Sequence, residues 1–138
     1  MDVVILIGRI LFSALFLFSG AGHLTQSKTM AQYAAGKSVP LPQVSVLLSG
    51  AVVLVGGLSV LLGIWADLGS LLLVAFLVPT AAIMHGFWSE SDPTTRQTEM
   101  IQFNKDLALA GAALMLFAFF AHNGDLGLTI TGPLFTVN

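Results

Sequence analysis

The sequence predicts an all-α fold: a four-helix transmembrane bundle with a short interfacial helix in its first loop. Of the 138 residues, 56% are hydrophobic and only 9% are charged, whereas a soluble domain carries about a quarter charged residues. Four apolar segments stand out, and each is close to the roughly 20 residues that cross a bilayer as a helix. They comprise about residues 3–22, 44–64, 68–88 and 103–122 of one membrane domain, 1–138.

The first segment is expected to be a transmembrane helix that stays attached, not a secretory signal. No basic stretch precedes it, Arg9 interrupts it, and its apolar run exceeds the usual signal length of about 7 to 15 residues. Arg9 is expected to pair with Asp67 or Asp125, which belong to the same end of the bundle. Snorkelling of Arg9 to the interface and a ligand-binding role are the alternatives.

The connections between segments carry their own signals. Ser27 is expected to cap a short interfacial helix that Gly36 ends, and Pro42 opens the second long helix. Only residues 65–67 separate the second and third helices, which predicts an antiparallel hairpin. Pro79 is expected to kink the third helix or weaken its hydrogen bonding. The glycine-rich residues after the fourth helix predict an irregular tail at the interface.

An even number of spans places the loops 23–42 and 89–102 on one side of the membrane and both termini on the other. Four of the five basic residues lie on the side of these loops, so the positive-inside rule places the loops in the cytoplasm. The same side collects polar residues from several helix ends, including His23, His85, Trp88, Lys105 and Asp106.

His85 lies about one turn inside the end of the third helix, where water is scarce. It could donate a hydrogen bond to a quinone carbonyl or carry a proton, or it could be satisfied structurally by another helix. His23 lies nearer to water and is more simply an interfacial residue, and His122 a polar residue at a helix end.

Asp106 near the start of the fourth helix benefits from the helix dipole but is costly beside lipid, so it needs a partner. Lys105 is expected to point about 100° away around the helix, which leaves His85 or Arg96 as the partner. Asp106 is then either a catalytic or proton-relay group or a structural link between helices. Lys105 can snorkel to lipid phosphate or contact a ligand, and Trp88 can belong to an interfacial aromatic belt or stack beside a quinone ring.

Several chemistries find no support. The chain has no cysteine, which excludes disulfides, iron–sulfur ligation and thiolate zinc sites. No haem, metal or nucleotide motif occurs, and no two histidines share a helix at ligand spacing, so no haem or metal is expected. The net charge of −2 gives no reason to expect nucleic acid binding.

The stretches "GRILFSALFLFSGAGHL", "YAAGKSVPLP", "HGFW" and "FNKDLALAG" resemble the DoxX family of small four-helix membrane proteins. The family is named for a subunit of a thiosulfate:quinone oxidoreductase, and relatives are linked to quinol oxidase complexes and redox-stress assemblies. The resemblance implies a prokaryotic cytoplasmic membrane, and its polar positions fall on Arg9, His85, Trp88 and Lys105.

The chain departs from the family pattern at three places. Val53 stands where members often have a glutamate, Asp106 follows Lys105 where an asparagine is common, and Pro79 is unexpected in the third helix. The missing glutamate weakens any proton-transfer scheme copied from relatives. Asp106 could restore an acid at a different height.

We therefore expect a quinone-interacting subunit of a membrane oxidoreductase, in which His85 and Asp106 are catalytic and handle hydrogen bonds or protons. The quinone would contact His85, Trp88, Lys105 and Arg9. Beyond the lipid bilayer, the partner would be another membrane or redox protein, or a small reductant such as thiosulfate. The alternative is a non-catalytic accessory or assembly subunit of a larger membrane complex. A small-solute transporter lacks the mid-bilayer charges that such sites use.

Overall fold

Five α-helices and one turn of 3₁₀ helix make up most of the chain. The computed structural model describes residues 1–123 and 126–137, and it contains no strand in that part. The elements are α1 (Asp2–Thr25), α2 (Ser27–Gly36), α3 (Pro42–Leu62), α4 (Ala66–Met84), η1 (Phe87–Ser89) and α5 (Pro93–Asn123). Four helical segments are long and apolar enough to cross a membrane. This confirms the predicted all-α fold with four transmembrane helices.

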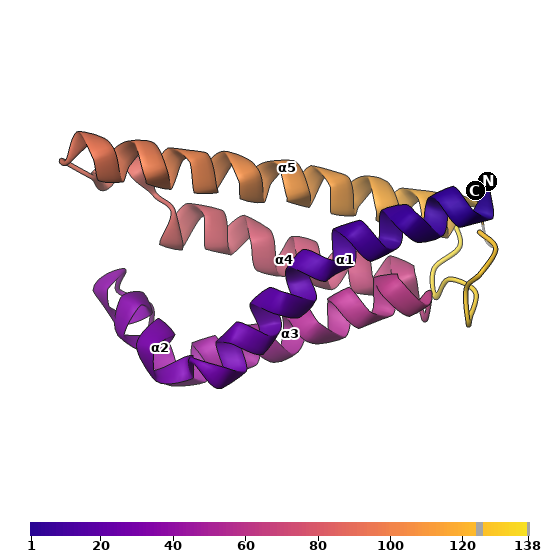
Figure 1. The fold of residues 1–138 in the computed structure, drawn as a ribbon, viewed down its shortest axis with the longest axis horizontal. Helices are drawn as coiled ribbons and strands as arrows, with labels where there is room; N and C mark the ends of the chain where they lie inside the picture. Colours follow the sequence, from indigo (N-terminus) through magenta and orange to yellow (C-terminus); the bar gives the residue numbers. More distant parts are fainter. Residues whose placement is uncertain (124–125, 138) are drawn as a thin grey trace.

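The long helices pack in sequence, with α1 against α3, α3 against α4 and α4 against α5, while the short α2 folds back onto α3 (Figure 1). Both termini lie at one end of the bundle, and α2 lies at the other end together with the start of α5 (Figure 1). Apolar side chains from α1, α3, α4 and α5 form the main core. Its buried members are Phe16, Val53, Val60, Leu73, Leu77, Ala110 and Ala113.

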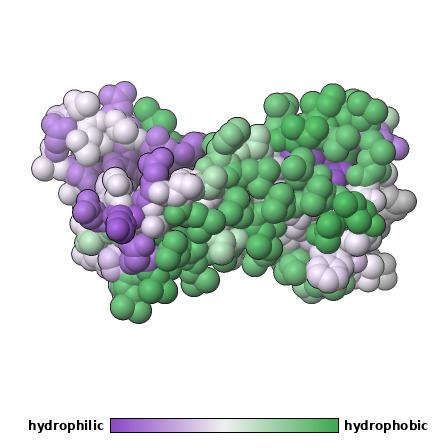
Figure 2. All heavy atoms as spheres, turned by 60° about the horizontal axis from the view of Figure 1, so that its bottom comes forward, coloured by the Kyte–Doolittle hydropathy of each residue, from purple (hydrophilic) through white to green (hydrophobic). Residues whose placement is uncertain are grey.

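The outer surface is divided along the bundle. Hydrophilic side chains gather at the end formed by α2 and the start of α5, and hydrophobic side chains cover most of the remainder (Figure 2). Phe18 and Met115, for example, are 81% and 69% exposed. Exposed apolar surface of this extent would be unfavourable in water, whereas it suits contact with lipid chains.

Glycines bring the helices close together at two crossings. A Cβ atom at Gly50 of α3 would lie 2.6 Å from the Cβ of His23 on α1. At the other crossing, a Cβ at Gly69 of α4 would lie 3.0 Å from the carbonyl oxygen of Gly56 on α3. Such close backbone approach is a general way of packing membrane helices. It also fixes the position of His23 against α3.

The helix boundaries differ from the predicted ones most strongly at α5, which begins ten residues before the expected 103. Asp92 Oδ2 accepts hydrogen bonds of 2.8 Å from both the backbone N–H and the hydroxyl of Thr95, and Pro93 occupies the first helical position. These hydrogen bonds lower the pKa of Asp92. With 31 residues, α5 is about 46 Å long, so its first turns extend beyond a hydrocarbon core of about 30 Å.

The start of α2 and the course of α4 around Pro79 are the next two features to compare with the prediction. Ser27 was expected to cap α2, but it is the first helical residue, and Gln26 occupies the capping position without a side-chain hydrogen bond. The Ser27 hydroxyl instead accepts a hydrogen bond of 3.0 Å from Gln43 Nε2. Pro79 lies inside α4, and the helix continues through it to Met84.

The predicted ion pair between Arg9 and Asp67 is wrong. The Arg9 side chain is only 2% exposed, and it donates to the carbonyl oxygens of Val60, Leu61 and Leu128 at 2.8, 2.6 and 3.0 Å. Asp67 instead accepts hydrogen bonds from the backbone N–H groups of the tail. The other proposed partner, Asp125, lies outside the described residues.

The carbonyl groups at the end of α3 are free for Arg9 because a helix has no internal donors for its last turn. Gly63 ends α3 with a φ of +65°, and a Cβ there would lie 2.8 Å from Arg9 Nη2. A side chain would therefore disturb both the left-handed backbone and the arginine. Arg9 thus holds the α3–α4 connection rather than a partner carboxylate.

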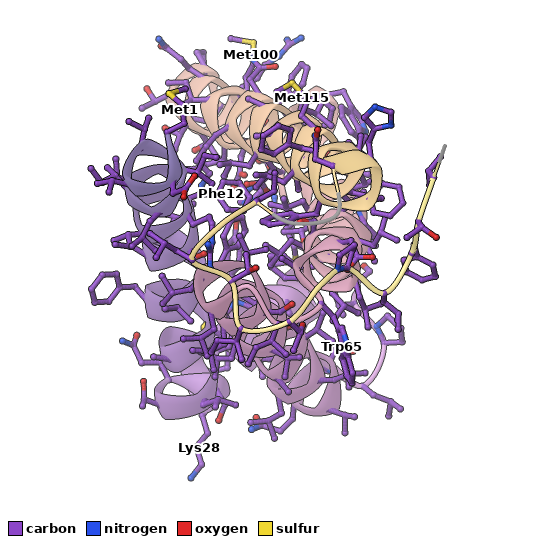
Figure 3. All side chains as sticks on the ribbon, turned by 90° about the vertical axis from the view of Figure 1, so that its right-hand side faces the viewer. Met1, Phe12, Lys28, Trp65, Met100 and Met115 are labelled. Atoms are coloured by element: carbon purple, nitrogen blue, oxygen red, sulfur yellow. The ribbon has the colours of Figure 1, made fainter. Side chains whose placement is uncertain are left out.

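The tail after α5 is irregular over residues 126–137, as predicted. It crosses the end of the bundle that holds both termini (Figure 3). The N–H groups of Ile130 and Thr131 donate to the carbonyl oxygen of Gly63 at 3.1 and 3.0 Å. Leu134 and Phe135 donate to Asp67 at 3.0 and 2.6 Å. The tail therefore closes this end by backbone hydrogen bonds.

The close crossing of α1 and α3 predicts different tolerance at two glycines. Gly50→Ala should lower the free energy of unfolding by about 1–3 kcal/mol, because the new methyl group overlaps His23. Gly22→Ala is the matched control, since a Cβ at Gly22 meets no atom within 4 Å, and it should be neutral or stabilising. Denaturant unfolding of the two variants in detergent measures the difference, and equal losses would contradict the crossing.

Candidate functional site

A cavity of about 660 Å³ lies at the polar end of the bundle, and all five α-helices contribute to its wall. Its size falls within the range of small-molecule sites. Most of the wall is apolar, with Phe16, Phe76, Leu77 and Leu109 among the lining residues. Nine lining residues are polar: Ser19, His23, Tyr33, Ser45, Ser49, Thr80, His85, Lys105 and Asp106.

Beside the cavity, the buried carboxylate of Glu99 on α5 joins groups from three other segments. Tyr33 of α2 donates its hydroxyl hydrogen to Oε1 at 2.8 Å, and His85 Nδ1 lies 2.7 Å from Oε2. Lys37 Nζ lies 3.7 Å from Oε1. A buried carboxylate is costly unless it is paired and hydrogen-bonded, and both oxygens of Glu99 have partners.

The cluster continues from Glu99 towards the aqueous end. The ammonium group of Lys37 donates to Glu90 at 2.7 Å, and this hydrogen bond raises the pKa of Lys37 although burial opposes it. Burial raises the pKa of Tyr33, and its hydrogen bond to Glu99 raises it further. Tyr33 is 48% exposed as a residue, so the cluster reaches from the cavity to the surface.

In the other direction, His85 faces Asp106. His85 Nε2 lies 3.7 Å from Asp106 Oδ2, and Lys105 Nζ lies 3.7 Å from Asp106 Oδ1. The expectation that Lys105 points away from Asp106 is therefore wrong, because its long side chain bends back along α5. Glu99 and Asp106 are seven residues apart, which is about two turns, so both lie on the helix face that His85 contacts.

His85 reaches this position because α4 ends one residue before it. Met84 is the last helical residue, and His85 and Gly86 connect α4 to η1. The rings of Phe87, Trp88 and Phe103 pack edge to face with centroids 5.4 to 5.6 Å apart. This aromatic cluster attaches the end of α4 to α5 and so holds His85 between the two carboxylates.

His23 on α1 also contributes to the wall of the cavity. Its Nδ1 lies 2.9 Å from the hydroxyl oxygen of Ser49 and 3.3 Å from the carbonyl oxygen of Val46. The ring packs edge-on against Phe76, with centroids 5.8 Å apart. His23 is buried, and it lines the cavity together with His85.

The structure brings together three of the five site residues predicted from the sequence. His85, Asp106 and Lys105 line the cavity. Trp88 is 59% exposed and is not among the lining residues, and Arg9 binds backbone carbonyls at the opposite end.

Sequence reasoning missed Glu99, Tyr33 and Lys37. Glu99 lies in the predicted loop 89–102, whereas the structure places it on α5, which begins at Pro93. The sequence Asp92-Pro93 is a helix-start signal that would have extended α5, and the seven-residue spacing to Asp106 would then have placed both acids on one side.

The described residues contain no group of three or more His, Asp or Glu side chains that could hold a metal ion. The cluster of Glu99, His85 and Asp106 is an alternation of carboxylate and imidazole, which is suited to hydrogen bonding and proton exchange.

Comparison with known proteins places the chain. The family model of DoxX matches residues 4–86, the part from α1 to the end of α4. The chain belongs to the DoxX family. The inner membrane protein YqjF of Escherichia coli (strain K12) is 31% identical over 118 residues, which cover 83% of this chain and 82% of that protein. No solved structure matches.

Membership of the DoxX family agrees with the four apolar helices, and the chain is an integral membrane protein. The DoxX match includes His23 and His85 but ends before Glu99 and Asp106. The two carboxylates that contact His85 therefore come from the part of the chain beyond the DoxX match.

The Tyr33–Glu99 hydrogen bond predicts how Tyr33 titrates. The pKa of Tyr33 is raised by burial and by Glu99, so the phenol should ionise above its ordinary value of about 10. Because the folded-state pKa is the higher one, the associated stability is fully present below pH about 10 and is lost as pH rises through the folded-state pKa. Tyr33 is the only tyrosine, so its tyrosinate absorbance reports one group.

Glu99→Gln should move this titration back towards the ordinary value, because it removes a neighbouring negative charge. Asp92→Asn is the control, since it removes a charge at the same end without a contact to Tyr33. A wild-type titration at the ordinary value would contradict the buried hydrogen bond.

Proposed function

We propose that this protein is a quinone-interacting subunit of a membrane oxidoreductase, with the cavity at the polar end as its quinone site. The observation that supports the proposal most is the placement of His85, Lys105 and Asp106 in the wall of an otherwise apolar cavity. A quinone head group is a flat ring with polar oxygens at two edges, and its tail is apolar. An apolar cavity with a few polar groups has the matching chemistry.

Access from the bilayer also favours a lipid-soluble ligand. Leu15, Leu48 and Ile83 line the cavity, and they are 45%, 63% and 52% exposed on the outer surface. The wall of the cavity therefore continues onto the apolar surface that faces lipid. A quinone could enter laterally while its tail remained among lipid chains.

In this proposal, His85 and Asp106 exchange hydrogen bonds and protons with the head group, and Lys105 supplies a positive charge at the mouth. Trp88 stays at the interface beside Phe87 and Phe103, and Arg9 is structural. The polar end with α2 would face the cytoplasm, as the basic residues suggest. The name of the relative YqjF, an inner membrane protein, supports a cytoplasmic membrane location.

Quinone retention tests the proposal. The protein purified in mild detergent should carry quinone that is detectable by mass spectrometry of the extracted lipids. The double variant His85→Ala, Asp106→Ala should lose at least about 90% of it, because two polar contacts of about 1 kcal/mol or more each are removed. His122→Ala is the control, since His122 lies at the opposite end of α5, and it should retain quinone.

Absence of quinone from the wild-type protein and from both variants would sink the proposal. A stable large complex recovered without quinone would instead favour the non-catalytic accessory role, in which the exposed apolar helix faces dock against a larger membrane complex.

A further inference from the structure

We infer that the cavity selects the reduced, dihydroxy form of a quinone, and that His85 with Glu99 forms the pair that takes a proton from its hydroxyl group. This inference rests on the proposed function and adds which redox form is bound. The polar atoms of His85, His23 and Asp106 that face the cavity accept hydrogen bonds, whereas a quinone carbonyl can only accept them.

The hydrogen bonds of Glu99 determine the tautomer of His85. Glu99 receives the hydroxyl hydrogen of Tyr33 on Oε1 and lies near the ammonium group of Lys37, so it is held as an acceptor. The 2.7 Å contact to Oε2 then requires the hydrogen on His85 Nδ1, and Nε2 of the neutral ring carries a lone pair.

The distance between His85 and Asp106 leaves both side chains open to a ligand hydroxyl. Nε2 and Asp106 Oδ2 are 3.7 Å apart, which is too long for a direct N–H···O hydrogen bond. Both atoms accept hydrogen bonds, and Asp106 is buried. A ligand hydroxyl placed to one side of the pair, within hydrogen-bond distance of both atoms, would satisfy one of the two acceptors.

The tautomer of His23 follows from similar reasoning. Its Nδ1 contacts the carbonyl oxygen of Val46, which can only accept. The Ser49 hydroxyl gives its own hydrogen to the same carbonyl at 2.9 Å, so it too accepts from Nδ1. His23 therefore carries its hydrogen on Nδ1, and Nε2 of the neutral ring is an acceptor.

Both histidines and Asp106 line the one cavity. Ser19 and Thr80 also line it, but a hydroxyl can donate or accept and does not discriminate. Lys105 donates one hydrogen bond to Gln102, and its other N–H groups can donate to a carbonyl or a hydroxyl oxygen alike, so it does not discriminate either. A bound quinone would leave buried acceptors unsatisfied, at about 1–3 kcal/mol each. A hydroquinone, with an O–H group at each end of its ring, avoids that cost.

The proton step balances within this chain. The O–H bond of the ligand breaks as an N–H bond forms at His85 Nε2, and the proton on Nδ1 passes to Glu99 Oε2. The ligand gains one negative charge and the Glu99 carboxylate becomes neutral. The imidazole is left neutral with its hydrogen on Nε2. Glu99 then releases its proton towards the carboxylate of Glu90, which is paired with Lys37 at the polar end.

Binding of a matched redox pair tests the inference. Decyl-ubiquinol and decyl-ubiquinone, titrated separately into the detergent-purified protein by calorimetry, should differ by about tenfold or more in favour of the quinol. Equal affinities, or tighter binding of the quinone, would overturn the inference and leave the proposed quinone site intact. Binding of neither compound would overturn both.

A variant that removes one hydrogen-bond acceptor, compared with a control variant, tests the role of Glu99. Glu99→Met keeps the side-chain length but removes the acceptor that holds the hydrogen of His85 on Nδ1. The affinity for the quinol should therefore fall about tenfold, while the affinity for the quinone stays within about twofold. Asp92→Asn is the control, because Asp92 lies at the same end of the bundle but contacts Thr95 and not His85 or Glu99, and it should change neither affinity. An unchanged quinol preference in Glu99→Met would overturn the role of Glu99.

Asp106→Asn provides a second variant that preserves shape. An amide can donate where the carboxylate only accepts, so quinol affinity should fall and quinone affinity should rise, narrowing or reversing the preference. Retention of the full quinol preference in this variant would contradict the inference, whether or not Glu99→Met folds.

Discussion

The polar end of this membrane protein depends on one buried carboxylate. Glu99 on α5 accepts from Tyr33 on α2, lies beside Lys37 just after α2, and contacts His85 just after α4. These contacts add to the packing of α2 on α3 and of Phe87 and Trp88 on Phe103 of α5. A buried acid without partners costs several kcal/mol, and removal of one partner of such a group is correspondingly costly. Glu99 therefore links the segments at this end of the bundle. Through its contact with Nδ1 it also favours the inferred tautomer of His85, in which Nε2 is the acceptor.

The opposite end is closed by the same kind of interaction but with backbone partners. Arg9 donates to carbonyl groups at the end of α3 and in the tail, and Asp67 accepts from N–H groups of the tail. Between the two ends, glycines such as Gly50 let the helices approach closely. The cavity thus lies at one end of a scaffold whose other end is fixed. That division is consistent with a site in which ligand groups approach His85 while the helices remain in place.

The number of helices and their apolar parts could be predicted because a bilayer fixes the length and hydropathy of a spanning helix. The convergence of His85, Lys105 and Asp106 followed from the alternating direction of the spans. The start of α5 was missed because its first turns are polar, and hydropathy does not report a helix outside the bilayer. Glu99 was therefore not predicted as a site residue, although Asp92 and Pro93 mark the start of α5. The partners of Arg9 were mispredicted because backbone carbonyls leave no signature in sequence.

The position of the hydrogen on His85 is the most direct test of this account. Nitrogen NMR of the detergent-purified protein labelled at histidine distinguishes the tautomers, and the chain has only three histidines. Loss of one signal set in His85→Gln assigns the ring. Above the ordinary titration range of histidine, the contact with Glu99 predicts hydrogen on Nδ1, with Nε2 unprotonated towards Asp106. Hydrogen on Nε2 would show that Glu99 does not determine the tautomer of His85. It would also contradict the inference that Nε2 accepts a proton from the ligand.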